Sequence, residues 1–139
     1  MKIRCITLTL LILAAVAFQA AGQTSTTTWL NGTWTGAGDQ RSAGKGTWSM
    51  KLTYDAAKNI AAVDYASLSC KSTWKMLEGN ALKAVFVETL STGKQTCTEG
   101  LSVVVTKVNA GSVKVAFFNP GDNVNDASKT LTSLILTKT

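Results

Sequence analysis

Few side chains in this sequence are suited to acid–base or nucleophilic chemistry. The chain of 139 residues contains no histidine, and its charged side chains number 14 basic and 8 acidic. Without histidine, catalysis by Ser-His-Asp or Cys-His groups is excluded, and the usual zinc sites lack a main ligand. The sequence therefore predicts a protein that is not an enzyme and that holds no metal or other cofactor.

Two carboxylates flanking a bond could still hydrolyse a glycoside. No converging pair is expected, because most acids fall in expected turns or on polar faces: Asp39, Asp55, Glu78, Asp122 and Asp126. The glycines within residues 36–46 are not followed by the helix that a phosphate-binding loop needs. They indicate a mobile loop between the first two strands instead.

Glu88 is the one acidic residue that the pattern places among apolar side chains. It shares strand parity with Phe86 and Leu90, and a charge on an inward face needs a partner because its desolvation is costly. As a functional residue, Glu88 would be a polar anchor inside a ligand cavity. Two alternatives stay open: the face carrying Val85 points inward and Glu88 is solvated, or Glu88 forms a structural ion pair with Arg41 or a lysine.

Four tryptophans are the other candidates for contact with a ligand, since indole rings can stack on sugars or line pockets. Aromatic residues on strands more often belong to the core, so core packing is the competing interpretation. Trp29 is expected to be the most exposed of the four. The candidate ligand-binding residues are accordingly Trp34, Trp48, Trp74, Glu88 and Arg41.

Residues 1–22 have the layout of a secretory signal peptide. Lys2 and Arg4 precede a short apolar run over residues 6–18, and small residues suited to cleavage occupy positions 20–22. The alternative, an uncleaved membrane anchor, would need about 20 apolar residues. We therefore expect a secreted or periplasmic protein without stable membrane insertion after cleavage.

The rest of the chain has the length of a single domain. A flexible polar lead-in is expected over residues 23–28 and one domain over residues 29–139. The formal charge of the whole chain is +6, but after the leader its basic residues are scattered singly. Because nucleic-acid binding needs clustered lysines and arginines, no nucleic-acid partner is expected.

Two cysteines, Cys70 and Cys97, remain after Cys5 is removed with the expected leader. In an oxidising compartment two such cysteines form one disulfide. No thiol nucleophile is then left in the chain, and a metal role for the cysteines lacks histidine partners.

From residue 29 onward, apolar residues alternate with polar ones, and turn residues separate the alternating segments. Residues 47–54 show it best, with one fully apolar and one fully polar face, as a half-buried strand requires. About eight strands are expected, over residues 29–35, 47–54, 60–65, 70–76, 81–90, 95–107, 112–118 and 130–137.

Short turns between these segments predict an all-β meander of antiparallel strands. Such a meander either closes into a small barrel or folds into a β-sandwich. Closure removes exposed strand edges, which favours the barrel. Alternation alone does not distinguish a barrel with a cavity from one filled by its own side chains.

A set of residues follows an ordered pattern along the chain: Trp34, Gly36, Val63-Asp64-Tyr65, Cys70, Glu88, Gly93 and Cys97. This set resembles a small two-cysteine β domain found at the extracytoplasmic ends of some bacterial serine/threonine kinases and in short exported proteins. Ala66 stands where that family has a proline. The resemblance implies an extracytoplasmic location and a scaffold role for Glu88 and the disulfide.

Gly32-Thr33-Trp34, on the first expected strand, resembles the opening Gly-x-Trp of lipocalins and the similar start of avidins. Both are secreted barrels of the calycin type, and the resemblance implies a ligand held inside the barrel. No residues match the biotin site of an avidin.

The expected function is non-catalytic binding of an unknown small apolar or glycan ligand at the mouth of the barrel, in a lipocalin-like manner. The alternative is a protein-interaction module, such as an inhibitor or immunity factor, with an unknown protein partner. The first predicts a concave pocket near Trp34, Trp48 and Glu88. The second predicts a filled barrel that acts through the loops at residues 36–46 and 119–129.

Overall fold

The computed structural model describes residues 26–39 and 46–139. The expected leader and Arg41 lie outside the described residues. The strands are β1 (Gly32–Asp39), β2 (Thr47–Asp55), β3 (Ile60–Tyr65), β4 (Cys70–Gly79), β5 (Lys83–Thr92), β6 (Ser102–Asn109), β7 (Ser112–Phe118) and β8 (Thr132–Lys138). The short 3-10 helices are η1 (Thr28–Leu30), η3 (Ala66–Leu68) and η4 (Ala127–Lys129).

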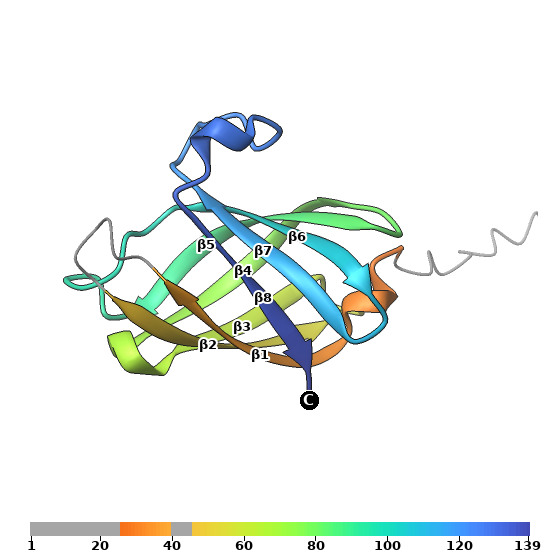
Figure 1. Cartoon of the computed structure of the whole chain (residues 1–139), viewed down its shortest axis with the longest axis horizontal. Helices are drawn as coiled ribbons and strands as arrows, with labels where there is room; N and C mark the ends of the chain where they lie inside the picture. Colours follow the sequence, from red (N-terminus) through yellow and green to blue (C-terminus); the bar gives the residue numbers. More distant parts are fainter. Residues whose placement is uncertain (1–25, 40–45) are drawn as a thin grey trace, which may run out of the picture.

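The eight strands form a closed barrel in which each strand pairs with its neighbours in sequence (Figure 1). All pairs are antiparallel, and β8 pairs with β1 at Thr35↔Thr137 and Trp34↔Lys138. The predicted all-β meander is therefore confirmed and its barrel form established, whereas the sandwich alternative is wrong. Closure gives both edges of the meander a hydrogen-bonded partner.

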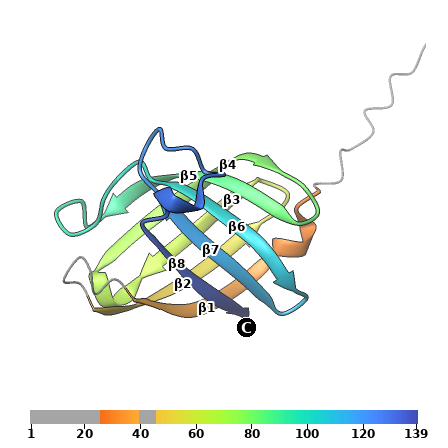
Figure 2. The ribbon, with the colours of Figure 1, turned by 45° about the horizontal axis from the view of Figure 1, so that its top comes forward.

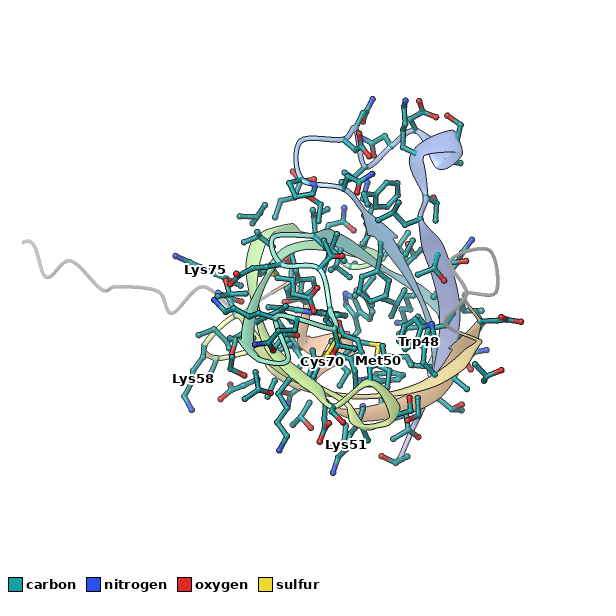
Figure 3. All side chains as sticks on the ribbon, turned by 90° about the vertical axis from the view of Figure 1, so that its left-hand side faces the viewer. Trp48, Met50, Lys51, Lys58, Cys70 and Lys75 are labelled. Carbon is teal, nitrogen blue, oxygen red and sulfur yellow. A yellow bond between two sulfur atoms is a disulfide. The ribbon has the colours of Figure 1, made fainter. Side chains whose placement is uncertain are left out.

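The alternating pattern of β2 separates the inside of the barrel from the outside. Trp48 and Met50 are buried, whereas Ser49 and Lys51 are exposed. Figure 3 looks along the barrel: Trp48, Met50 and Cys70 lie inside the ring of strands, and Lys51, Lys58 and Lys75 point outward. One face of each strand thus fills the core and the other faces solvent.

Aromatic rings fill the middle of the barrel. Trp74 contacts Phe86 at 5.7 Å and Phe117 at 5.8 Å between ring centroids, and Phe86 contacts Tyr54 at 5.8 Å. Edge-on and tilted contacts of this kind stabilise aromatic pairs beyond the area that they bury. These aromatic contacts therefore pack the middle of the barrel.

The expected boundaries differ from the structure most clearly at three places. Trp29 lies in η1 rather than in the first strand, which begins at Gly32. Residues 95–101 form a loop, and the sixth strand begins only at Ser102. Gly36 lies within β1, which extends to Asp39, so the expected loop at 36–46 is shorter than its glycines suggested.

The loop between β7 and β8 packs against the outside of the barrel. Val85, Val104 and Phe118 point outward but are at most 7 % exposed, and Val124 of the loop packs against them. Lys83 Nζ donates a hydrogen bond of 2.7 Å to the side chain of Asn125 in the same loop. The loop with η4 stands out beyond the strands in Figures 1 and 2. Within residues 26–39 and 46–139, no helix has the length and apolar character needed to cross a membrane.

Candidate functional site: a hollow at one end of the barrel

One end of the barrel is closed by η1 and the residue before it. Leu30 is fully buried, and its carbonyl accepts a hydrogen bond of 2.7 Å from the indole of Trp34. Thr27, expected in a flexible lead-in, is also fully buried, and its hydroxyl lies 2.7 Å from that of Tyr54. Lys138 Nζ lies 5.1 Å from the ring of Trp34, close enough for a cation–π contact. This end therefore offers no entry to the interior.

A hollow of about 80 Å³ lies at the opposite end. Its walls come from the end of β3 and η3, the middle of β5, the loop between β5 and β6, and the strand ends around the β7–β8 loop. Figure 3 views the barrel from this end. The volume is enough for a few water molecules or for a small organic group. The hollow is shallow because the aromatic rings described above fill the barrel beneath it.

Three aromatic side chains form one wall of the hollow. Trp48 lies 5.7 Å from Tyr65 and 6.0 Å from Phe117 between ring centroids, and Tyr65 lies 6.4 Å from Phe117. The three residues occupy inward positions near the ends of β2, β3 and β7. Leu68, Leu101 and Leu131 add an aliphatic rim. The lining is thus mainly apolar.

Glu88 lies on the inward face of β5 and is only 2 % exposed. The solvated alternative therefore does not hold. Val85 faces the other way and is buried because the β7–β8 loop covers it. Glu88 lines the hollow together with Thr98 and Thr132. Thr98 is exposed and Thr132 half-buried, so Glu88 is the most deeply buried of these three side chains.

Two neutral donors hold the Glu88 carboxylate, and both reach the same oxygen. The hydroxyl of Tyr65 donates to Oε1 at 2.6 Å, and the indole of Trp74 donates to the same atom at 3.1 Å. Hydrogen bonds to a charged acceptor are short and strong, and they offset part of the cost of burial. No lysine of the described chain forms an ion pair with Glu88; the ion pairs found there lie at the surface.

The phenol of Tyr65 is fixed in its protonated form. Burial raises the pKa of Tyr65 well above the ordinary value of 10.0, and the negative charge of Glu88 raises it further. Ionisation would place two negative charges next to each other away from water. Tyr65 therefore serves as a hydrogen-bond donor to Glu88 over the whole physiological pH range.

The predicted disulfide is present and anchors one wall of the hollow. Cys70 and Cys97 are bonded, with 6.5 Å between their Cα atoms. Cys97 lines the hollow, so the bond ties the loop between β5 and β6 to the beginning of β4. Gly93 has φ of +81°, and a Cβ there would lie 2.7 Å from the sulfur of Cys70. Glycine at this position lets the loop pass close to the disulfide.

The candidate residues taken from the sequence do not all lie in the same place. Trp48 and Glu88 both line the hollow, and Trp74 lies behind Glu88 as its hydrogen-bond donor. Trp34 is fully buried near the closed end. Arg41 lies outside the described residues.

Sequence reasoning missed Tyr65 and Phe117 as lining residues. Both sit at inward positions close to the ends of their strands, where a barrel interior opens. In a meander, alternate strand ends meet at the same end of the barrel. Grouping the inward residues nearest those ends would have identified the two aromatic side chains.

The described residues form no metal-binding cluster, and comparisons with known proteins found no match. Among residues 26–39 and 46–139, no three or more Cys, Asp or Glu side chains cluster in a way that could hold a metal ion. The chain matches no protein-family model, no curated protein and no solved structure.

Proposed function

We propose that this protein is an exported, non-catalytic binding module that takes a small, mainly apolar ligand into the open end of its barrel. The observation that carries the proposal is the asymmetry of the two ends. One end is closed by Leu30, and the other has a hollow walled by Trp48, Tyr65 and Phe117. Small-molecule sites are mostly apolar concavities with a few placed polar groups.

The groups that line the hollow agree with a site that binds a ligand and does not catalyse a reaction. Among the described residues, the lining offers one carboxyl, Glu88, and its cysteine, Cys97, is held in a disulfide. Of the two ligand classes expected from the sequence, an apolar molecule suits the hollow better than a glycan. A sugar needs an open ring face to stack on, whereas Trp48 is only 4 % exposed.

The test is tryptophan fluorescence and thermal melting of the purified protein against small apolar molecules and oligosaccharides. Saturable changes in emission with a raised melting temperature are expected for apolar molecules, because a ligand that binds only the folded state stabilises it. Leu131→Ala should weaken binding, since Leu131 lines the hollow. Ile135→Ala is the matched control, because Ile135 is similarly exposed, at 51 % against 40 %, but lies outside the hollow lining. If no compound changed the emission or the melting temperature, the proposal would be contradicted.

A second candidate function, protein binding through the β7–β8 loop, is favoured by one observation. The backbone N–H and the hydroxyl of Ser128 donate to the carboxylate of Asp126 at 3.0 and 2.6 Å, and these bonds hold the loop in a fixed shape together with the packing of Val124. A preformed loop binds a partner with little ordering cost. This function would be favoured if the protein inhibited a secreted hydrolase and Asp122→Ala removed the inhibition. No small molecule should then bind in the hollow.

A further inference from the structure

The buried carboxylate in the hollow lacks a cationic partner among the described residues. Glu88 accepts hydrogen bonds from Tyr65 and Trp74, which are both neutral, and both bonds end on Oε1. A buried acid is normally paired with a cation or coordinates a metal. The described part of the chain supplies neither at this place.

We propose that the ligand of the hollow is a small organic cation, a primary or secondary amine whose ammonium group binds the Glu88 carboxylate against the aromatic wall. This inference rests on the proposed function and names the ligand's chemical class. It goes beyond an apolar pocket because it assigns Glu88 the role of the recognition group.

The aromatic wall suits a cation. Trp48, Tyr65 and Phe117 surround one side of the hollow with ring centroids 5.7 to 6.4 Å apart. An ammonium group, unlike a sugar ring, is small enough to approach a single aromatic ring inside the hollow, and the attraction between cation and ring grows when both are withdrawn from water. Aromatic rings beside a carboxylate are the combination that recognises organic ammonium ions, since the rings tolerate alkyl substituents and the carboxylate supplies the charge.

A wholly apolar ligand suits Glu88 less well. It would cover the carboxylate without offering a donor, and the lost hydration would not be replaced. An ammonium group replaces that hydration with a charge-assisted hydrogen bond. The amine is therefore expected to bind more tightly than a neutral molecule of the same shape.

The side chains at the rim of the hollow determine which chemical groups the rest of the ligand should carry. Leu68, Leu101 and Leu131 line the outer part of the hollow, which fits an alkyl or aryl stem that points toward solvent. The volume of about 80 Å³ limits the inserted part to the ammonium group and a few carbons. The expected ligand is therefore amphipathic, with its charged end deepest.

The net charge of the protein makes the test selective. The whole chain carries a formal charge of +6, which becomes +4 once Lys2 and Arg4 are removed with the expected leader, so its overall field repels cations rather than collecting them. Saturable binding of an amine then reports a local site and not a general attraction to the surface.

The experiment compares butylamine, 1-butanol and butyrate, and the matching phenylethyl series, by calorimetry and tryptophan emission on the purified protein. Each amine should bind about tenfold more tightly than its alcohol, the difference expected between charged and neutral hydrogen bonds. The acids should not bind. Potassium and calcium chlorides are included as probes for a simple inorganic cation, and saturation by these salts in place of the amines would overturn the inference.

Glu88→Gln removes the charge and keeps an oxygen that can accept from Tyr65 and Trp74. It should remove the tenfold advantage of the amine and leave the alcohol's affinity unchanged. The control is Glu99→Gln, which removes a half-exposed carboxylate that pairs with Lys94 at 3.0 Å in the neighbouring loop. This control should alter neither affinity.

A second variant keeps the test decisive if Glu88→Gln does not fold. Phe117→Leu removes one ring from the wall but keeps an apolar side chain, so it should weaken amine binding more than alcohol binding. Equal affinity for amine and alcohol in the unaltered protein would overturn the cation inference and leave the proposed function standing. Failure of every amine and every apolar molecule to bind would overturn both.

Discussion

Gly38 and Trp48 lie directly opposite each other in the β1–β2 pair, and the indole of Trp48 occupies the space over Gly38. A Cβ added at Gly38 would lie 2.6 Å from two carbons of the indole. Because Trp48 contributes to the aromatic wall, the absence of a side chain on β1 determines how that wall is placed. Glycine here is a packing requirement and not a source of backbone freedom.

Gly38→Ala is expected to destabilise the protein by about 1–3 kcal/mol, the usual cost of overfilling a packed interior. The indole must shift, so the emission spectrum of Trp48 and the affinity for any ligand of the hollow should change as well. Urea unfolding and fluorescence measure the two effects. Gly111→Ala is the control, since a Cβ there meets only one atom within 4 Å, at 3.8 Å. Equal stability of the two variants would show that Trp48 does not need the space.

Stability is expected to depend on pH in the alkaline range through Tyr65. Its pKa in the folded protein is raised well above the 10.0 of an unfolded chain, so above about pH 10 the unfolded state loses a proton that the folded state retains. The free energy of unfolding therefore falls as the pH rises through 10, and this contribution is fully present below that value.

Tyr65→Phe isolates this effect. The difference in unfolding free energy between the unaltered protein and Tyr65→Phe should shrink as the pH rises above 10, measured by urea unfolding at each pH. Absorbance at the tyrosinate band should reveal ionisation of Tyr65 only after denaturant is added. A native tyrosinate signal that Tyr65→Phe removes near pH 10 would contradict a raised pKa.

Most of the fold could be predicted because it depends on local pattern. The alternation of Trp48, Met50, Leu52 and Tyr54 with polar residues predicts both the strand and its inward face, and short turns predict antiparallel neighbours. The loop before Ser102 was less predictable, since Leu101 shares strand parity with Val103 and Val105 and so extends their pattern back toward the loop. There the disulfide and the hydrogen bonds of Thr96 and Cys97 to the carbonyl of Gly93, both 2.9 Å, override the pattern.

The site was less predictable than the fold because it depends on contacts across the barrel. Tyr65 and Glu88 lie on β3 and β5, which are separated by β4, and their 2.6 Å contact exists only because the closed sheet curves both side chains inward. The alternating pattern of the strand could place Glu88 on an apolar face, but it could not predict which side chains donate hydrogen bonds to it. The depth of the hollow depends on how Trp74 and Phe117 fill the interior, which no pattern in the sequence specifies.

Removing the disulfide is expected to affect stability and the hollow together. The double variant Cys70→Ala/Cys97→Ala frees a loop closed across a sequence separation of 27, and the chain-entropy relation gives a loss of about 3–4 kcal/mol. Urea unfolding with and without reductant measures the loss. Because Cys97 is part of the lining, ligand binding should weaken even under conditions where the variant is fully folded. Undiminished binding would show that the loop keeps its place without the bond.

The closed end should behave in the opposite way, because it contributes to stability and does not touch the hollow. Thr27 is fully buried with its hydroxyl 2.7 Å from that of Tyr54, and Thr27→Val keeps the shape while removing that hydroxyl. A loss of about 0.5–1.5 kcal/mol is expected, since one buried hydrogen bond is removed while the Tyr54 hydroxyl still donates to Asn59 at 3.3 Å. Thr33→Val, which removes a hydroxyl 3.3 Å from that of Thr53 near the surface, should cost less than about 0.5 kcal/mol. Both variants should bind ligands as the unaltered protein does, and weakened binding by Thr27→Val alone would show that the two ends of the barrel are coupled through its aromatic interior.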